Sequence, residues 1–437
     1  MVNNVIVVGA GLAGSEAAYQ LAKRGINVTL YEMKPNKFSP AHKSANFAEL
    51  VCSNSLKAKE LTTSSGLLKK ELELFDSLIM QAANACSIPA GGALAVDREM
   101  FSEYITNKLK SFSNIEIINE ELTVIPEDKI VIIATGPLSS DDIVKALQKK
   151  INQEYLYFFD ASSPIVTSQS IDMSVAFVGD RYGKGNGDYI NCPMNKQEYF
   201  TFYNELINAE SVKLHDFENK KVFEGCMPIE VMAKRGEDSI RFGPLKPVGL
   251  ANPHKDEKPY AVVQLRKEDN DNRLYNLVGF QTNLTYGEQK RVFSLIPGLN
   301  NANFVRYGVM HRNSYVNAPT VLTKTFALKN DENVFIAGQL SGVEGYLEST
   351  ASGLIAAINA YQKIKEKNAI ILTDKTMIGA IINYITNASA DNFQPMNSNY
   401  GIIRPLEERV KDDKLKKSIY AQRSIEEIEL LLKQLED

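Results

Sequence analysis

The amino-acid sequence predicts an α/β fold, in which a parallel sheet is covered by helices and interrupted by an inserted, smaller α+β domain. Two observations support this class. Short apolar runs end in glycine-rich turns and lead into helices at positions far apart in the chain, and parallel strands need crossover connections of this kind. Between these positions, over residues 196–303, the composition shifts toward short strand-like pieces, aromatic residues and basic residues.

The first element is a strand, a glycine-rich turn and a helix near the N-terminus. The β-branched run Val5–Val8 suits a strand that is buried on both faces, and residues 15–24 have the apolar spacing of a helix. A second strand, residues 27–31, ends on Glu32, which follows Gly14 by 18 residues (32 − 14). The turn between the first strand and the helix reads Gly9-Ala10-Gly11-Leu12-Ala13-Gly14.

This arrangement predicts a dinucleotide site of the Rossmann type. The first glycine allows the tight turn, the second lets the backbone approach a pyrophosphate, and the third lets helix and strand pack closely. The pyrophosphate lies at the helix N-terminus, and the carboxylate of Glu32 is placed to accept from a ribose hydroxyl. The alternative is an ordinary glycine-rich turn, which the surrounding strand, helix, strand and acid disfavour.

Loops, helices and strands alternate after Glu32. Residues 33–47 are polar and contain two prolines, which predicts a loop. Helices are expected over residues 66–86 and 99–110, and strands over residues 115–118, 122–125 and 129–133. The last of these strands runs into Ala134-Thr135-Gly136. This tripeptide recurs in flavoproteins of the glutathione reductase class, where the backbone turns close to the cofactor.

A third glycine-bearing strand end lies late in the chain. The strand expected over residues 333–336 precedes a turn and a helix over residues 348–365, and the turn contains Gly338, Gln339, Gly342, Gly345 and Tyr346. Three such strand ends favour FAD over NAD as the resident cofactor. We therefore expect a discontinuous, Rossmann-like FAD-binding domain of the glutathione reductase class. It covers residues 1–195 and 304–437, includes a helical tail from Glu407, and encloses the inserted domain of residues 196–303.

Bulk composition excludes several other classes. The 437 residues contain no apolar run near the length of about 20 that spans a bilayer, and no secretory signal, so a cytoplasmic protein is expected. The four cysteines lie far apart without a CxxC pair, which argues against a metal site or redox dithiol. The formal charge is −4. Residues 220–320 hold 15 Lys and Arg against 10 Asp and Glu, a local excess that by itself is typical of a solvated face.

Several blocks of sequence resemble the TrmFO family of flavin- and folate-dependent RNA uridine C5-methyltransferases. The resemblance covers essentially the whole chain, and its blocks are residues 11–18, 31–33, 40–42, 47–55, 89–98, 223–228, 338–353 and 393–397. It implies FAD as cofactor, methylenetetrahydrofolate as carbon donor with tetrahydrofolate as product, and NAD(P)H as reductant. Most members methylate the T-loop uridine of tRNA, and a branch methylates a uridine of 23S rRNA.

The resemblance also implies roles for two cysteines. Uridine C5 becomes nucleophilic only after addition at C6, and a thiolate is the side chain best suited to that addition. Cys226, in the block Phe223–Pro228, takes the family's nucleophile position, and Cys52 takes that of the second cysteine, with a role in proton transfer or in holding the carbon unit. The alternative for each is a buried structural cysteine, the role that we expect for Cys86 and Cys192.

Basic and aromatic side chains supply the remaining candidates. Phosphate contacts to RNA are expected from Arg235, Arg241, Lys246, Arg266 and Arg312. Tyr346 is expected to stack near the flavin, with an ordinary core position as the alternative. No metal ligand set is expected.

Three other functions compete with this one. The related flavoenzymes that modify the tRNA wobble uridine are much longer chains and need a partner GTPase. An FAD oxidoreductase acting on a small molecule would have no use for Cys226, and a non-catalytic RNA-binding flavoprotein would not couple NAD(P)H oxidation to methylation. We take tRNA as the default substrate because it is the family's commoner task. A uridine of 23S rRNA stays the alternative, because the recognised blocks concern chemistry that both branches share.

Overall fold

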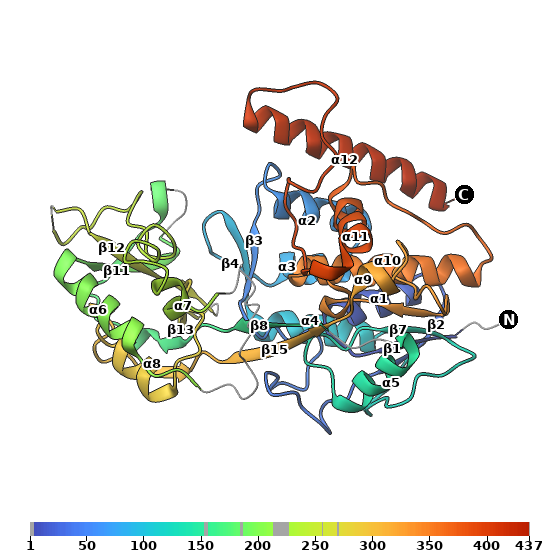
Figure 1. Cartoon of the computed structure of the whole chain (residues 1–437), viewed down its shortest axis with the longest axis horizontal. Helices are drawn as coiled ribbons and strands as arrows, with labels where there is room; N and C mark the ends of the chain where they lie inside the picture. Colours follow the sequence, from blue (N-terminus) through green and yellow to red (C-terminus); the bar gives the residue numbers. More distant parts are fainter. Residues whose placement is uncertain are drawn as a thin grey trace.

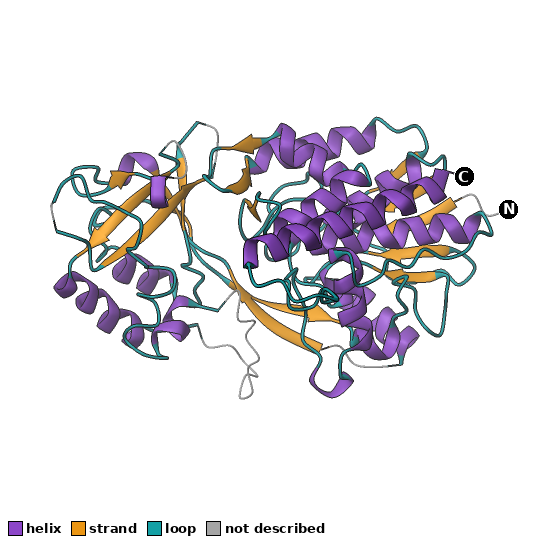
Figure 2. Ribbon diagram, turned by 90° about the horizontal axis from the view of Figure 1, so that it is seen from above, coloured by secondary structure: helices purple, strands orange, loops and turns teal. Residues whose placement is uncertain are grey.

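The chain folds into two lobes joined by a two-stranded ribbon (Figures 1 and 2). The computed structural model describes residues 4–152, 156–183, 187–212, 227–255, 257–268 and 271–436. The ribbon consists of β8 (Leu156–Ala161) and β15 (Met310–Tyr315), which pair antiparallel. The larger lobe holds a five-stranded sheet, and the smaller lobe holds a six-stranded sheet.

The sheet of the larger lobe is parallel and contains the strands expected from the apolar runs. Its order is β16-β7-β1-β2-β6, and neighbouring strands pair in parallel. The bounds are β1 Asn4–Val8, β2 Asn27–Tyr31, β6 Ile115–Ile118, β7 Ile130–Ile133 and β16 Val334–Ile336. The strand predicted over residues 122–125 does not form. Leu122 instead lines a cavity and Val124 is 71% exposed, so this run does not have the buried surroundings of a central strand.

Two helices pack side by side above this sheet. They are α1 (Leu12–Ala22) and α10 (Tyr346–Ile364), whose sequences are rich in alanine. Their approach requires glycine, because a Cβ added at Gly353 would lie 2.1 Å from the Ala13 carbonyl oxygen. The helices confirm the predicted segments after the first and third glycine-bearing turns.

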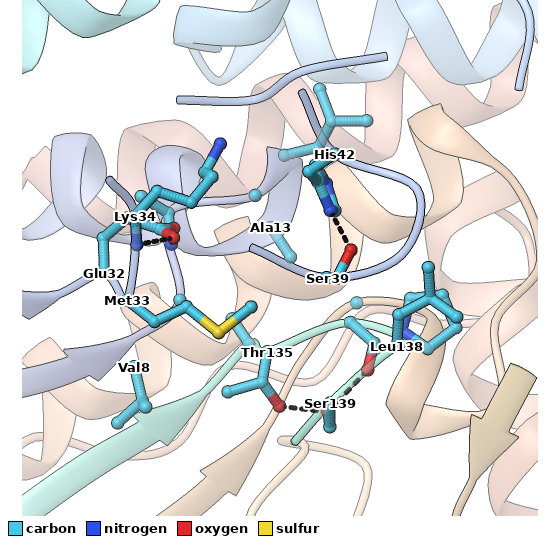
Figure 3. Close-up of a pocket in the computed structure, with 18 of the residues that line it drawn as sticks. Val8, Ala13, Glu32, Met33, Lys34, Ser39, His42, Thr135, Leu138 and Ser139 are labelled. Atoms are coloured by element: carbon cyan, nitrogen blue, oxygen red, sulfur yellow. Dashed lines mark hydrogen bonds between the residues drawn. The ribbon is translucent and has the colours of Figure 1, made fainter. Parts of the chain in front are cut away.

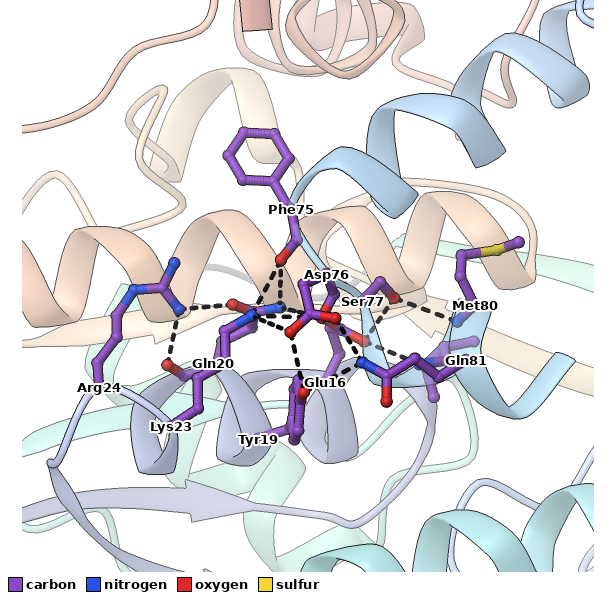
Figure 4. Close-up of polar contacts among 11 residues, drawn as sticks. Glu16, Tyr19, Gln20, Lys23, Arg24, Phe75, Asp76, Ser77, Met80 and Gln81 are labelled. Carbon is purple, nitrogen blue, oxygen red and sulfur yellow. Dashed lines mark hydrogen bonds and ion pairs between the residues drawn. The ribbon is translucent and has the colours of Figure 1, made fainter. Parts of the chain in front are cut away.

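The single helix predicted over residues 66–86 is wrong, since the structure has α2 (Ser64–Leu74) and α3 (Leu78–Ala85). The break lies at Asp76, whose φ is +56°. A buried carboxylate explains the break (Figure 4): Glu16 of α1 accepts from the Ser77 hydroxyl at 2.8 Å and from the Ile79 N–H at 3.1 Å. The carboxylate therefore satisfies donors at the start of α3 that a continuous helix would not present. Burial raises the pKa of Glu16.

Within its described residues, the smaller lobe contains an antiparallel sheet of short strands and three α-helices. Its sheet has the order β10-β11-β12-β13-β9-β14, and the paired strands are antiparallel. The strands are β9 Ile165–Thr167, β10 Phe177–Val178, β11 Tyr189–Met194, β12 Ala261–Lys267, β13 Leu274–Leu277 and β14 Phe304–Arg306, and the helices are α6 Lys196–Asn208, α7 Ile229–Ala233 and α8 Tyr286–Phe293. This sheet extends on both sides beyond the range 196–303 predicted for the insertion.

The other elements complete the larger lobe. They are β3 Ser55–Ala58, β4 Ser87–Ile88, β5 Ala93–Val96, α4 Arg98–Lys110, α5 Asp141–Ile151, α9 Ala318–Val321, α11 Met377–Asn387 and α12 Asp413–Glu436. The C-terminal helix α12 lies over α2 (Figure 1). Glu71 of α2 joins these elements, because its carboxylate accepts from the N–H groups of Met377 (2.6 Å) and Ile378 (2.8 Å) and from the Ser424 hydroxyl.

Candidate functional site

A cavity opens at the carboxyl ends of β1, β2, β7 and β16, where open parallel sheets bind their ligands (Figure 3). Its empty volume is about 1150 Å³, including space open to solvent, which is the scale of a cofactor site. The wall includes predicted cofactor-binding residues from all three glycine-bearing turns: Gly9, Ala10, Gly11, Leu12, Ala13, Glu32, Ala134, Thr135, Gly136, Gly338, Gln339 and Tyr346.

The backbone of the first turn needs glycine at two positions for different reasons. Gly9 has φ of +92°, and an added Cβ would lie 2.8 Å from the Ala134 carbonyl oxygen. Gly14 does not line the cavity; its added Cβ would lie 1.8 Å from the Gly9 carbonyl oxygen. Gly9 therefore brings two strand ends together, and Gly14 lets α1 pack on β1, as the third glycine of the fingerprint should.

Two glycines of the third turn also lie away from the wall. Gly342 packs against the Phe393 ring, to which an added Cβ would come within 2.6 Å. Gly345 is the residue before α10. Both shape the entry into α10, which brings Tyr346 and Ser349 to the cavity.

The Glu32 carboxylate fixes the turn beside which a nucleotide would bind. It is 6% exposed, and it accepts from the Ala10 N–H at 2.8 Å and from the Lys34 N–H at 3.0 Å. These bonds connect the end of β2 to the first glycine turn. The carboxylate also lines the cavity, where its remaining lone pairs can accept from a ligand hydroxyl.

Sequence reasoning missed a group of lining residues in the loop after β2. Lys34, Ser39 and His42 come from the segment 33–47, which was predicted only as a loop (Figure 3). Glu49, just beyond this segment, also lines the cavity. The Ser39 hydroxyl and His42 Nδ1 lie 2.5 Å apart. Burial, with Lys34 adding to it, lowers the pKa of His42, so its neutral form is favoured. A loop has no periodicity that could have marked these residues as lining the site.

A second polar contact, also missed, lies on the opposite wall. The hydroxyls of Thr135 and Ser139 are 2.5 Å apart, and both residues line the cavity. Ser139 also donates to the Gly136 carbonyl at 2.7 Å. The turn after β7 is therefore held by its own side chains. The sequence marked Ala134, Thr135 and Gly136 but not the contact with Ser139.

Cys52 lies beside the cavity, held to its wall through Tyr346. The phenol oxygen of Tyr346 accepts from the backbone N–H of Cys52 at 2.9 Å and from that of Ser53 at 3.1 Å. Val51 and Tyr346 line the cavity, and Cys52 is half-buried next to them. Burial raises the pKa of the Tyr346 phenol, so the phenol is neutral. Cys226, the predicted nucleophile, lies outside the described residues, as does most of its block.

The residues predicted to contact RNA have different surroundings. Arg235 and Lys246 are exposed on the smaller lobe. The Arg241 guanidinium stacks 4.0 Å from the centre of the Tyr260 ring. Arg266 is 8% exposed and donates to Ser53 and Asn54, which suits an internal role better than a phosphate contact. Arg312 belongs to β15, and its side chain lies outside the described part of the chain.

Comparison with known proteins places the chain in a family. The family model described as glucose inhibited division protein A matches residues 4–368. A protein of Caldicellulosiruptor bescii named methylenetetrahydrofolate–tRNA-(uracil-5-)-methyltransferase TrmFO is 58% identical over 423 residues, 96% of this chain and 97% of the relative. A Fusobacterium nucleatum protein of the same name is 56% identical over 98% of each chain. The chain belongs to the TrmFO family. The sequence resemblance is thereby confirmed.

Solved structures support the fold assigned to this member of the TrmFO family. Aquifex aeolicus GidA, in its form II crystal, superposes with a TM-score of 0.69 at 18% identity, over 99% of this chain and 76% of that one. The likeness confirms the α/β fold class with a Rossmann-like architecture. Among the described residues, no group of three or more His, Cys, Asp or Glu side chains is placed to hold a metal ion. No helix within the described ranges is long and apolar enough to cross a membrane.

Proposed function

We propose that this chain methylates uracil C5 in RNA, using methylenetetrahydrofolate as carbon donor, FAD as cofactor and NAD(P)H as reductant. The observation that carries the proposal is the contact between Tyr346, in the cavity wall, and the segment that contains Cys52. It places a sulfur-bearing residue beside a cofactor-sized cavity. The relatives' name adds the donor and the substrate class.

The residues around the cavity fit FAD. At Gly11 an added Cβ would meet no protein atom closer than 4.0 Å, so the backbone at the start of α1 leaves room for a pyrophosphate, and the helix N-terminus favours its charge. Glu32 would accept from a ribose hydroxyl. When bound, FAD would supply the two electrons and the relay for the folate-derived carbon. The protein's part is to hold folate, cofactor and base close together and to exclude water.

Two cysteines would act on the base. We propose that the Cys226 thiolate adds to uracil C6, so that C5 becomes nucleophilic and bonds to the folate-derived carbon. Removal of the C5 proton then expels the thiolate from C6, and a hydride that derives from the reductant would complete the methyl group. Cys52, beside the cavity, is the candidate to take that proton or to hold the carbon unit. The uridine must leave its stack to reach them, which costs least from an RNA loop.

The names of the relatives support the substrate class. We propose tRNA, with the T-loop uridine as target, and keep a uridine of 23S rRNA as the alternative. We propose that the smaller lobe, on which Arg235 and Lys246 are exposed, is the side of the molecule that binds RNA. We also propose that the protein is located in the cytoplasm. Mapping 5-methyluridine in both RNAs after deletion of the gene distinguishes the targets, because only the true substrate loses its modified base.

A Cys226 variant tests the reaction class. Purified Cys226→Ala is expected to lose all methylation and to form no covalent adduct with RNA that contains 5-fluorouridine, while FAD content stays unchanged. Cys192→Ala is the matched control, because Cys192 is buried in the core of the smaller lobe. An unchanged turnover of Cys226→Ala would refute the methyltransferase proposal and support an oxidoreductase that acts on a small molecule.

A further inference from the structure

Three arginines from both lobes converge on the segment that contains Cys52. Arg98 is the first residue of α4 in the larger lobe, whereas Arg266 (β12) and Arg306 (β14) belong to the smaller lobe. Arg98 donates to the carbonyls of Leu50 and Cys52, the second at 3.2 Å. Arg306 donates to the carbonyl of Val51.

Arg266 binds the other end of the same segment. Its guanidinium donates to the Ser53 hydroxyl at 2.8 Å and to the Asn54 side-chain oxygen at 3.1 Å. Asn54 in turn donates to the carbonyl of Lys267 at 2.9 Å. Residues 50–54 are thus held at consecutive positions by side chains from the two lobes.

The charges around the segment are predominantly positive. Three guanidinium groups face one carboxylate, that of Glu268, which lies 2.6 Å from Arg98 and is 5% exposed. The Tyr346 phenol, on α10, is neutral because burial raises its pKa. Counting these groups gives +3 − 1 = +2 beside a half-buried thiol.

The sulfur of Cys52 is electrostatically coupled to each guanidinium. Burial lowers the pKa of Arg266 and of Arg306, and the ionised Cys52 acts on both pKa values in the opposite direction. At Arg98, burial also lowers the pKa, but Glu268, together with Cys52, produces a net rise. Because such coupling is reciprocal, each arginine favours the thiolate over the thiol.

We propose that Arg98, Arg266 and Arg306 are positioning residues that hold the Cys52 segment across the junction of the lobes and favour the thiolate form of its sulfur. The thiol proton is released to solvent. A thiolate at this position can accept a proton or attack an electrophilic carbon, and a thiol does neither well. The catalytic use of Cys52 rests on the proposed function, but its ionisation does not.

The test is the pH profile of Cys52 alkylation in the full-length protein without RNA or folate. Iodoacetamide labelling is followed by mass spectrometry of the tryptic peptide 44–57, in which Cys52 is the one cysteine. Arg306→Gln and Arg266→Gln are each expected to raise the midpoint by about one unit, and so to slow labelling about tenfold below the midpoint. Arg306→Lys and Arg266→Lys keep the positive charge, so their midpoints should lie close to that of the unsubstituted protein.

Two further variants separate charge from structure. Glu268→Gln removes the negative charge and is expected to lower the midpoint, and Arg181→Gln, on an arginine that contacts Gln264 and Val248 instead, should leave it unchanged. A purely structural loosening would change the maximal rate at high pH and leave the midpoint in place.

Arg306→Gln is the milder of the two charge-removing variants, because Arg306 is only half-buried. An unchanged midpoint in folded Arg306→Gln would overturn the proposal. If the unsubstituted protein fails to methylate RNA while the arginine variants show the expected midpoint shifts, the proposed function is refuted and the positioning role stands.

Discussion

The hydroxyl oxygen of Tyr346 lies 2.9 Å from the backbone nitrogen of Cys52, a residue 294 positions earlier in the chain. This bond joins the first residue of α10 to the sulfur-bearing segment. The glycine turn before α10 positions the Tyr346 ring, and the ring, together with the three arginines, holds the Cys52 segment. The cavity wall and the segment with the thiol are therefore joined by a direct hydrogen bond.

Tyr346→Phe is expected to lower methylation at least tenfold with the fold retained. Removing the oxygen leaves two backbone N–H groups, of Cys52 and Ser53, without their acceptor, at a cost of about 1–3 kcal/mol each if they stay buried. Methylation rate and thermal unfolding measure the effect. Tyr361→Phe, at the far end of the same helix, should change neither, and full activity in Tyr346→Phe would show that this bond does not position the segment.

Gly11→Ala and Gly14→Ala form a matched pair that separates ligand contact from packing. At Gly11 an added Cβ meets no protein atom closer than 4.0 Å, but at Gly14 it would lie 1.8 Å from the Gly9 oxygen. Gly11→Ala is expected to fold normally and to bind FAD at least tenfold more weakly. Gly14→Ala is expected to lose stability as well. Equal FAD affinity in Gly11→Ala and the parent would place the cofactor elsewhere.

Glu32→Gln is expected to raise the FAD dissociation constant at least about tenfold, since a hydrogen bond to a charged acceptor contributes about 1.5–3 kcal/mol. Titration of FAD with the purified apoprotein measures this constant. Glu127→Gln, on an exposed loop, is the control. If Glu32→Gln bound FAD as tightly as the parent, the carboxylate would serve only the bonds to Ala10 and Lys34.

The buried carboxyl of Glu71 is expected to make the free energy of unfolding depend on pH. Burial raises its pKa to about 7, against the lowering effect of its three hydrogen-bond donors. A folded-state pKa above the unfolded value means that folding favours the protonated form, so stability falls as pH rises from about 4.5 through about 7. Relative to Glu71→Gln, the parent should lose up to about 3 kcal/mol of unfolding free energy between pH 5 and pH 8.

Chemical denaturation of the parent and of Glu71→Gln across this pH range makes the comparison. Glu73→Gln, on an exposed position of the same helix, should follow the parent at every pH. A constant difference between the parent and Glu71→Gln would mean that the carboxylate stays ionised in the folded protein.

The features visible in the sequence are those with a local signature. Consecutive residues are enough to predict the first strand, the turn Gly9–Gly14 and the helix after it. The same holds for the turns at Gly136 and Gly338. The break at Asp76 depends on the carboxylate of Glu16, 60 positions earlier (76 − 16), and no local pattern contains it. Long-range polar contacts of this kind override helix periodicity.

In the candidate site, too, residues with a local sequence pattern were predicted, and residues placed by long-range contacts were not. Glu32 was found because a fixed spacing accompanies the glycine pattern, but Lys34, Ser39 and His42 reach the cavity only through the path of a loop. Arg266 was interpreted as a phosphate contact because a basic residue in a basic region suggests the surface. Its burial against Ser53 and Asn54 arises from the meeting of two lobes, which composition does not encode.

Transfer of labelled carbon from folate to RNA is the decisive measurement for the proposed methylation. The purified chain is incubated with FAD, NADH or NADPH, methylenetetrahydrofolate labelled in its methylene group, and tRNA or a 23S rRNA fragment that lacks 5-methyluridine. Label is expected in 5-methyluridine only when reductant, folate and substrate RNA are all present, and Cys226→Ala is expected to abolish this labelling. Absence of label from both RNAs, with FAD bound and NAD(P)H consumed, would refute the proposed methylation.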